Sequence, residues 1–364
     1  MPSVFLYEYI TGGGTYSARA PDTPPGSLLR EGAAMIGALA DDFSRIPGMK
    51  VLLLRDVRLP DLRFPSADIL EVADAQSERQ AFHDLSKRAD WTVLIAPEFD
   101  GVLLDRCRWA ESAGARLLSP PSAFVEVASE KNQTADQLRQ HGIPVPAAVP
   151  LIRGTQLPTN FSYPAVVKPC DGAGSVGVQS VTDQTAGYEV AFDGEIARLE
   201  EFRHGMPASV AILCGPRDKV ALPPCSQRIS DDGRFRYMGG KTPLDESLSL
   251  RAKRLGLAAV EALPPAVGYV GVDLILGDDP DGRDDVVIEV NPRLTTSYVG
   301  LRQLCQTNLA AAMMAVAQGH DVELSFAERP VEFDADGRVR VGNRGRGEEV
   351  SGVRCREEGG STGT

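Results

Sequence analysis

The stretch DVVIEVNPRLTTS, residues 285–297, places a carboxylate and a carboxamide two positions apart at the end of an apolar run. Residues i and i+2 of a β-strand point to the same face of a sheet, so Glu289 and Asn291 are predicted to face the same space. The run GYVGVDLIL, residues 268–276, precedes it across a polar turn, which predicts a hairpin. If the two strands pair antiparallel, Asp273 converges with Glu289 and Asn291.

These three side chains form a candidate metal site. Mg²⁺ takes oxygen ligands and usually keeps waters and substrate phosphates in the rest of its coordination sphere, so two carboxylates and one amide oxygen suit it. Charged groups on otherwise buried strands are costly without a partner. The alternative is that they are ordinary strand-end acids, in a chain with 50 Asp and Glu residues. The predicted ligands of Mg²⁺, or of Mn²⁺, are Asp273, Glu289 and Asn291.

Arg293 lies just beyond the predicted metal ligands, which indicates that an anion also binds there. Its planar guanidinium suits a transferring phosphoryl group or a substrate carboxylate. The alternative is a surface arginine that caps the following helix.

A glycine-rich loop follows a second apolar strand, in AVVKPCDGAGSVGV, residues 165–178. Glycines let backbone N–H groups approach phosphate oxygens, and Lys168 at the strand end can neutralise the phosphate charge. The pattern lacks the GxxxxGK[ST] order and the helix of a P-loop, which disfavours a Walker-type enzyme. The alternative for this loop is a plain hairpin turn.

Bulk properties narrow the class of protein. A chain of 364 residues is expected to form two or three domains. A net charge of -12 argues against nucleic acid and anionic membranes as partners. No apolar run approaches the roughly 20 residues of a membrane span, and the N-terminus lacks the basic start of a signal peptide, so a cytoplasmic location is expected. The six cysteines form no CxxC pair, and the four histidines are not spaced for zinc.

The N-terminal region alternates strands and helices, which predicts a parallel sheet covered on both faces. Ser27 is the predicted N-cap of its first helix, and a capping box of Ser77 and Gln80 is predicted to start the second. The triple glycine Gly12–Gly14 is either a flexible turn or a substrate loop beside Glu8 and Thr11. The predicted strands cover residues 4–10, 51–54, 68–72 and 91–97.

The second region begins near residue 119 with a predicted helix that ends at Gly142. Strand-like segments dominate from about residue 160, and another helix is predicted over 249–263. Past residue 328 the sequence predicts a hairpin on Asp336 and Gly337 and then disorder from residue 347.

Five motifs occur in an order that resembles the ATP-grasp superfamily of carboxylate–amine ligases. The resemblance covers about residues 119–325 and implies an α/β and α+β fold: an N-terminal parallel-sheet (pre-ATP-grasp) α/β domain, then a two-lobed ATP-grasp fold whose lobes close on ATP. The implied boundaries are 1–120 for the first domain, 121–205 and 206–328 for the two lobes, and 329–364 for a polar tail. The motifs are Lys131 in SEKNQT, Lys168 with GAGSVG, LEEF (199–202), GVD (271–273) and IEVNPR (288–293).

The resemblance assigns roles to individual residues. Lys131 and Lys168 would hold the α- and β-phosphates, Glu200 would accept the adenine amino group, and the backbone of Glu201 and Phe202 would form the hinge. A ribose-binding acid common in relatives is replaced near Pro207, which leaves the ribose contact open. The loop residues implied in phosphate binding are Gly172, Gly174, Ser175 and Gly177, and the arginines implied at the reacting phosphate are Arg293 and, more weakly, Arg228 in PCSQRIS.

The implied reaction is ATP-dependent amide formation through an acyl phosphate, with small-molecule carboxylate and amine substrates and release of ADP. EYITGGG near the start, APE at 96–98, EEFRHGMPASVAIL, and QRI followed by YMGGKTP are similar to the subgroup that contains tyramine–glutamate ligase, of methanofuran-type cofactor synthesis. Homodimers are frequent in the superfamily. The alternatives are a ligase for other amino acids or a dipeptide, a non-catalytic ATP-binding module, and a dinucleotide-dependent oxidoreductase, for which GxGxxG is missing.

Overall fold

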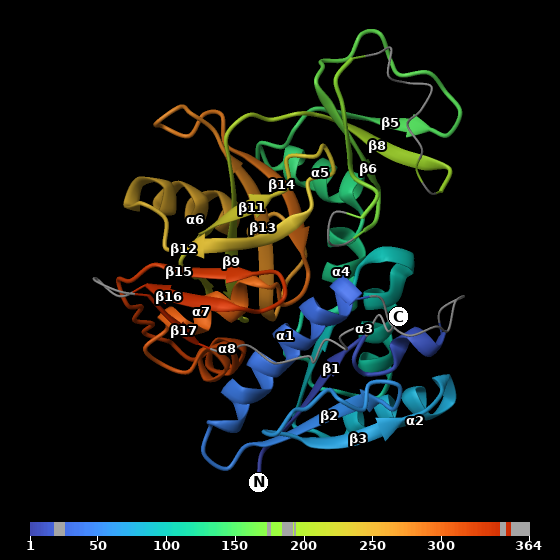
Figure 1. Cartoon of the computed structure of the whole chain (residues 1–364), viewed down its shortest axis with the longest axis vertical. Coiled ribbons are helices and arrows are strands. Elements are labelled where there is room, and N and C mark those ends of the chain that lie inside the picture. Colours follow the sequence, from blue (N-terminus) through green and yellow to red (C-terminus); the bar gives the residue numbers. More distant parts are fainter. Residues whose placement is uncertain (18–25, 173–175, 184–191, 193, 343–346, 351–364) are drawn as a thin grey trace, which may run out of the picture.

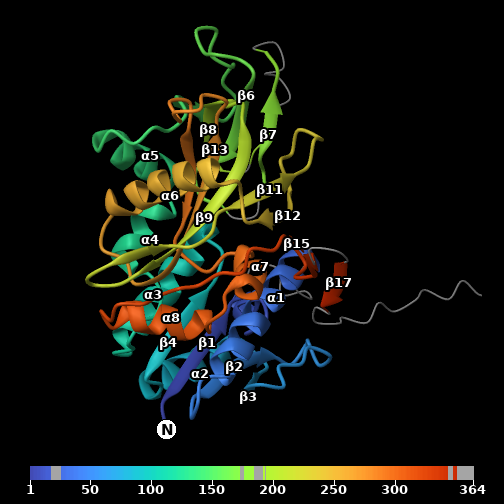
Figure 2. The same ribbon diagram turned by 90° about the vertical axis from the view of Figure 1, so that its left-hand side faces the viewer.

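The computed structural model describes residues 1–17, 26–172, 176–183, 192, 194–342 and 347–350. These residues form three β-sheets. The parallel N-terminal sheet lies at one end of the long axis and a small antiparallel sheet at the other, with a large antiparallel sheet between them (Figures 1 and 2). No helix among the described residues is both long and apolar enough to cross a bilayer.

The N-terminal sheet has the order β3-β2-β1-β4, and all its strands are parallel. Successive side chains of a strand point to opposite faces. Val4 and Leu6 therefore pack with α1 on one face, while Phe5 and Tyr7 pack with α2 and α3 on the other. The elements are β1 (Ser3–Glu8), η1 (Gly14–Ser17), α1 (Gly26–Ser44), β2 (Lys50–Asp56), β3 (Asp68–Val72), α2 (Ala75–Arg88), β4 (Trp91–Ile95), η2 (Phe99–Gly101) and α3 (Val102–Ser112).

Two predicted helix starts are wrong in detail. The first helix includes Gly26, so Ser27 lies inside it and is not its N-cap. The second helix is capped by Asp74, whose carboxylate accepts from the Ser77 backbone N–H, while the Ser77 hydroxyl accepts from the Asp74 N–H. Ser77 is thus the fourth residue of the capping box rather than its first, because the acidic cap three residues earlier takes that place.

The segment predicted as one helix near residues 119–142 forms two, α4 (Ser122–Ala128) and α5 (Lys131–Gln140). The break occurs at Glu130, whose carboxylate accepts hydrogen bonds from the backbone N–H groups of Asn132 and Gln133 and so caps α5. This break makes Lys131 the first residue of a new helix.

The small sheet has the order β5-β8-β6-β7, and its β6–β7 hairpin flanks the glycine-rich loop. The end of β6 and the described part of the glycine-rich loop thus lie together on the side of the small sheet that faces the large sheet. Its strands are β5 (Ala148–Ile152), β6 (Ala165–Pro169), β7 (Gln179–Val181) and β8 (Ile196–Glu201).

The large sheet has the order β14-β13-β9-β11-β12-β15-β16-β17, with β10 added beside β9. α6 packs on one face, while α7 and α8 pack on the other and share a continuous core with α1. The elements are β9 (Met206–Cys214), β10 (Lys219–Ala221), β11 (Cys225–Ile229), β12 (Tyr237–Thr242), α6 (Glu246–Glu261), β13 (Gly268–Leu276), β14 (Val286–Asn291), α7 (Ser297–Leu304), α8 (Leu309–Ala317), β15 (Val331–Asp334), β16 (Val339–Gly342) and β17 (Gly347–Val350).

The C-terminal hairpin belongs to this large sheet. β15 pairs with β12 and with β16, and Gly337 at the turn has φ 83°. β17 pairs with β16, so the expectation of disorder is wrong for residues 347–350, which find an open sheet edge. The rest of that expectation, for residues 351–364, falls outside the described residues.

Candidate active site

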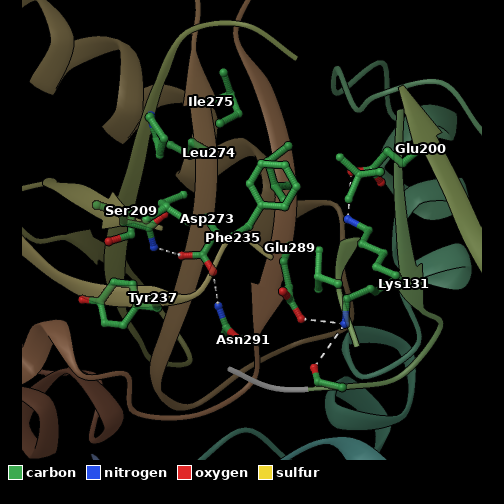
Figure 3. A pocket seen from close by; sticks show the side chains of 18 of the residues that line it. Lys131, Glu200, Ser209, Phe235, Tyr237, Asp273, Leu274, Ile275, Glu289 and Asn291 are labelled. Atoms are coloured by element: carbon green, nitrogen blue, oxygen red, sulfur yellow. Dashed lines mark hydrogen bonds and ion pairs between the residues drawn. The ribbon is translucent and has the colours of Figure 1, made fainter. Parts of the chain in front are cut away.

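A cavity of about 250 Å³ lies between the small sheet and the large sheet. Figure 3 shows Lys131 and Glu200 on one side of it and Asp273, Glu289 and Asn291 on the other. One wall thus carries lysines and the opposite wall carries acids.

The acidic wall follows from strand register. β13 and β14 pair antiparallel, with Asp273 opposite Glu289, as expected for the predicted hairpin. On either side of Asp273, Val272 and Leu274 are buried in the core that includes α6, which turns Asp273 toward the cavity. Its carboxylate accepts from Gln227 Nε2 at 2.8 Å and from Asn291 Nδ2 at 3.0 Å (Figure 3).

The charges of this wall fit a divalent cation. Burial, reinforced by the like charge of Glu289, raises the pKa of Asp273 to about 6. A cation between the two carboxylates would remove that repulsion. Within the described ranges, no three His, Cys, Asp or Glu side chains converge on one metal position. The ligands that the protein offers here are therefore two carboxylates, from Asp273 and Glu289, and the side-chain amide of Asn291. Such a partial oxygen shell suits Mg²⁺, which takes its other ligands from water and phosphate.

The two predicted lysines line the same cavity. Lys131 Nζ lies 2.9 Å from Glu289 Oε1 and donates to the Gly172 carbonyl oxygen at 3.1 Å. Burial alone would lower the pKa of Lys131, but the facing Glu289 carboxylate outweighs it and raises that pKa. Lys168 on β6 is 5 % exposed, and its Nζ donates to Glu200 Oε1 at 2.8 Å.

Glu200, which the resemblance implies as the acceptor for the adenine amino group, lines the cavity beside Lys168. Its second oxygen accepts from Arg198 Nε at 2.8 Å, and Arg198 also donates to Asn132 Oδ1. Burial would raise the pKa of Glu200, but Lys168 and Arg198 lower it below its ordinary value. Glu200 therefore holds Lys168 in place, and both of its oxygens already accept hydrogen bonds. Sequence reasoning missed Arg198, although alternation along β8 puts it on the face of Glu200.

The hinge residues define the apolar end of the cavity. The backbone N–H of Glu201 donates to the Ala147 carbonyl at 2.8 Å, and that of Phe202 donates to Pro164 at 3.1 Å. The ring of Phe202 lies 6.0 Å from that of Phe235, centroid to centroid. Together with Ile275 these rings give flat apolar walls, the environment that a purine ring prefers. Phe235 was not predicted, because its loop carries no motif.

The glycine-rich loop is described only in part. Gly172 lines the cavity and has φ 150°, and Gly177 has φ 74° beside Pro169. Both conformations favour glycine. The two other predicted loop residues, Gly174 and Ser175, lie outside the described residues.

The two predicted arginines separate. Arg293 lines the cavity, and its Nε lies 2.9 Å from the buried Glu98 carboxylate, which belongs to the N-terminal region. Arg228 does not line the cavity: its neighbours Gln227 and Ile229 do, while Arg228 points to the other face of β11 and pairs with Asp334. The structure therefore does not bring Arg228 to the site, because alternate residues of a strand face opposite ways. Glu98 is the last residue of the APE sequence at 96–98, which supports the resemblance to a ligase subgroup but was not predicted to be part of the site.

Family models match both parts of the chain. An ATP-grasp domain matches residues 128–297, and a pre ATP-grasp 3 domain matches residues 49–125. The chain is 26 % identical over 309 residues to the tyramine–L-glutamate ligase of Methanocaldococcus fervens, a match that covers 84 % of this chain and 93 % of that protein.

Solved structures share the fold. An ATP-grasp superfamily protein from Archaeoglobus fulgidus has a TM-score of 0.68 at 23 % identity, covering 92 % of each chain. An L-amino acid ligase from Bacillus licheniformis has a TM-score of 0.66 at 18 % identity, covering 91 % of this chain and 79 % of that one. With its two matched domains and the cavity between its lobes, the chain belongs to the ATP-grasp superfamily.

Proposed function

We propose that this enzyme joins the side-chain carboxylate of glutamate, or of a similar amino acid, to a primary amine such as tyramine, with conversion of ATP to ADP and phosphate. The similarity to a tyramine–L-glutamate ligase over most of both chains supports these substrates. The cavity supports the chemistry.

The observation that carries the proposal is the opposition of charges across this cavity. Lys131 and Lys168 face the Asp273 and Glu289 carboxylates, with Arg293 at one side and apolar rings at the far end. A triphosphate fits between such walls, because its oxygens need cations on every side. In this arrangement the adenine ring lies against Phe202, and the γ-phosphate lies toward Arg293.

The acid pair and Asn291 are the residues that would hold Mg²⁺ or Mn²⁺. A bound divalent ion supplies charge neutralisation at the phosphate oxygens and helps to orient the nucleotide. Lys131 and Lys168 add fixed positive charge on the opposite side. Glu200 and Arg198 keep Lys168 from moving away from the cavity.

Two displacements complete the proposed reaction. A carboxylate oxygen of the first substrate attacks the γ-phosphorus, the bond to the β-phosphate oxygen breaks, and ADP leaves. The amine nitrogen then forms a bond to the acyl carbon, the carbon–oxygen bond to phosphate breaks, and phosphate leaves while the nitrogen loses its excess protons. Arg293 stabilises the negative charge on the transferring oxygens, and no nucleophilic side chain is required.

The test is a product assay with purified enzyme, ATP, Mg²⁺, glutamate and a panel of primary amines. We expect ADP formation that needs both substrates and an amide product with the mass of glutamate plus the amine minus water. Amide formation without glutamate, or ADP formation that no carboxylate stimulates, would contradict the proposal.

A ligase that joins two amino acids is the second candidate, favoured by the shared fold with an L-amino acid ligase. In that case dipeptides form when amino acids replace the amine panel, and simple amines give no product. Mass spectrometry of the same reactions separates the two candidates.

A further inference from the structure

A second, smaller cavity lies at the carboxyl edge of the N-terminal sheet. The strand order β3-β2-β1-β4 changes direction between β1 and β4, and open α/β sheets bind ligands at the carboxyl ends of their strands at such a point. Glu8 ends β1 and Ile95 ends β4, and the two residues are register partners. Both line a cavity of about 40 Å³.

This smaller cavity adjoins the larger cavity between the two sheets, in which we place ATP. Glu31 on α1 and Arg293 after β14 line both. A group bound in the smaller cavity therefore lies beside the guanidinium toward which the γ-phosphate points.

The smaller cavity carries more negative than positive charge among its described residues. Arg293 is already paired with Glu98. The Glu8 carboxylate is buried and accepts hydrogen bonds from the backbone N–H groups of Ile10, at 3.1 Å, and Thr11, at 2.7 Å, and from the Thr11 side chain, all of them uncharged donors. The charge that acts on Glu8 is that of Arg293, which Glu98 already pairs. Glu31 is half-buried where the two cavities meet. The charge of Arg30 lowers the pKa of Glu31, but Arg30 is exposed and does not line the smaller cavity.

The Glu8 carboxylate lies close to α1, the helix that carries Glu31, because Gly32 has no side chain. A Cβ atom at Gly32 would lie 2.6 Å from the Glu8 carboxyl carbon, so only glycine admits this approach. Burial raises the pKa of Glu8 to about 7, partly offset by its backbone hydrogen bonds, and burial also raises the pKa of Glu31. Both acids thus lack a sufficient cation in the protein itself.

We infer that this cavity binds the protonated amino group of the amine substrate, with Glu31 and Glu8 as its acceptors; the inference rests on the proposed ligase function. Ile10, Leu28 and Met35 provide apolar walls for the carbon atoms next to the nitrogen.

Size and donor arrangement select this ligand class. A water needs about 10–15 Å³ of such volume, so the cavity holds about three water-sized groups, the size of an ammonium with its first two carbons. A divalent ion is disfavoured, since the Arg293 guanidinium lines this cavity and the described lining residues add no amide side chain as a third oxygen ligand.

Direct binding tests the inference without turnover. Calorimetric titrations of tyramine, phenethylamine and propylamine are compared with their alcohol counterparts, in which a hydroxyl replaces the amino group. We expect at least one amine to bind roughly 10- to 100-fold tighter than its alcohol, and Glu31→Gln to remove most of this preference. Glu126→Gln on the exposed face of α4 is the matched control and should keep it.

Equal binding of amines and alcohols by the unmodified enzyme, no amine binding at millimolar concentration, or an undiminished preference in Glu31→Gln would overturn the inference. Glu8→Gln is a second variant, with thermal melting to verify folding; Glu31 at the cavity mouth is the safer position to change.

A turnover assay separates this inference from the proposed function. Hydroxylamine, a small neutral nucleophile, captures an acyl phosphate as a hydroxamate. In Glu31→Gln the ratio of amide to hydroxamate formation should fall about tenfold or more, and an unchanged ratio would count against the ammonium site. If the unmodified enzyme forms no hydroxamate with any carboxylate, the proposed function fails, while the binding titrations still decide the ammonium site.

Discussion

Asp273 and Glu289 are held side by side by strand register, and the like charge of Glu289 adds to burial in raising the pKa of Asp273. We predict that Glu289→Ala lowers the rate of ADP formation roughly 100-fold or more, because the cation at the phosphates loses a ligand. Thermal melting should show a folded protein. Activity within a few fold of the unmodified enzyme would place the metal elsewhere.

In the proposed reaction Lys168 has a different role from the acids, since its fixed positive charge would hold the nucleotide. Lys168→Ala should raise the KM for ATP by roughly 10- to 100-fold, the cost of a charge-assisted hydrogen bond, with a smaller change in kcat. Steady-state kinetics at varied ATP measures both values. An unchanged KM for ATP would show that this lysine does not reach a phosphate.

Glu8 makes stability depend on pH. Its pKa rises from 4.5 to about 7 on folding, so between these values the folded protein keeps a proton that the unfolded chain has lost. Stability therefore falls as pH rises from 4.5 to 7, and at about 1.4 kcal/mol per tenfold change in proton affinity the loss approaches about 3 kcal/mol. Urea titrations at several pH values should show a flatter profile for Glu8→Gln, and the profile of Glu126→Gln should match that of the unmodified protein. The same slope in Glu8→Gln would assign the effect to another group.

Alternation along β11 gives a prediction at the scale of one strand. Gln227 donates to Asp273 inside the cavity, whereas Arg228 pairs with Asp334 on the opposite face. Gln227→Ala should lower kcat/KM for ATP about tenfold through the loss of a hydrogen bond to a charged group. Arg228→Ala should stay within about twofold, because exposed ion pairs contribute little. The reverse order of effects would contradict the assignment of the two faces.

Period-two patterns made the strands of this chain predictable. The hairpin of β13 and β14, and with it the pairing of Asp273 with Glu289, follows from apolar alternation and a polar turn. The orientation of Arg228 did not follow, because it depends on β15 joining the sheet next to β12, some 90 residues later in the chain. The second helix starts earlier than predicted because Asp74 caps it in place of Ser77, and the segment after residue 119 divides into two helices because Glu130 caps the second of them.

Contacts between distant segments complete the site at the scale of the whole molecule. Arg293 meets Glu98 across 195 residues, and the parallel sheet meets the core of α7 and α8 through α1. Motif order along the sequence indicated the two lobes. It did not indicate Phe235, which reaches the cavity only when the sheets pack against one another. Alternation along β8 could have indicated Arg198, and one of the two interpretations of the Gly12–Gly14 turn placed Glu8 beside a substrate.

The central claim is that ATP activates a substrate carboxylate between these lobes. Glutamate labelled with ¹⁸O in its side-chain carboxylate, incubated with ATP, Mg²⁺, an amine and the enzyme, tests it directly by mass spectrometry of the released products. The account predicts that one labelled oxygen appears in inorganic phosphate for each amide formed and that ADP is unlabelled. Label in AMP, or phosphate without label while amide accumulates, would contradict it.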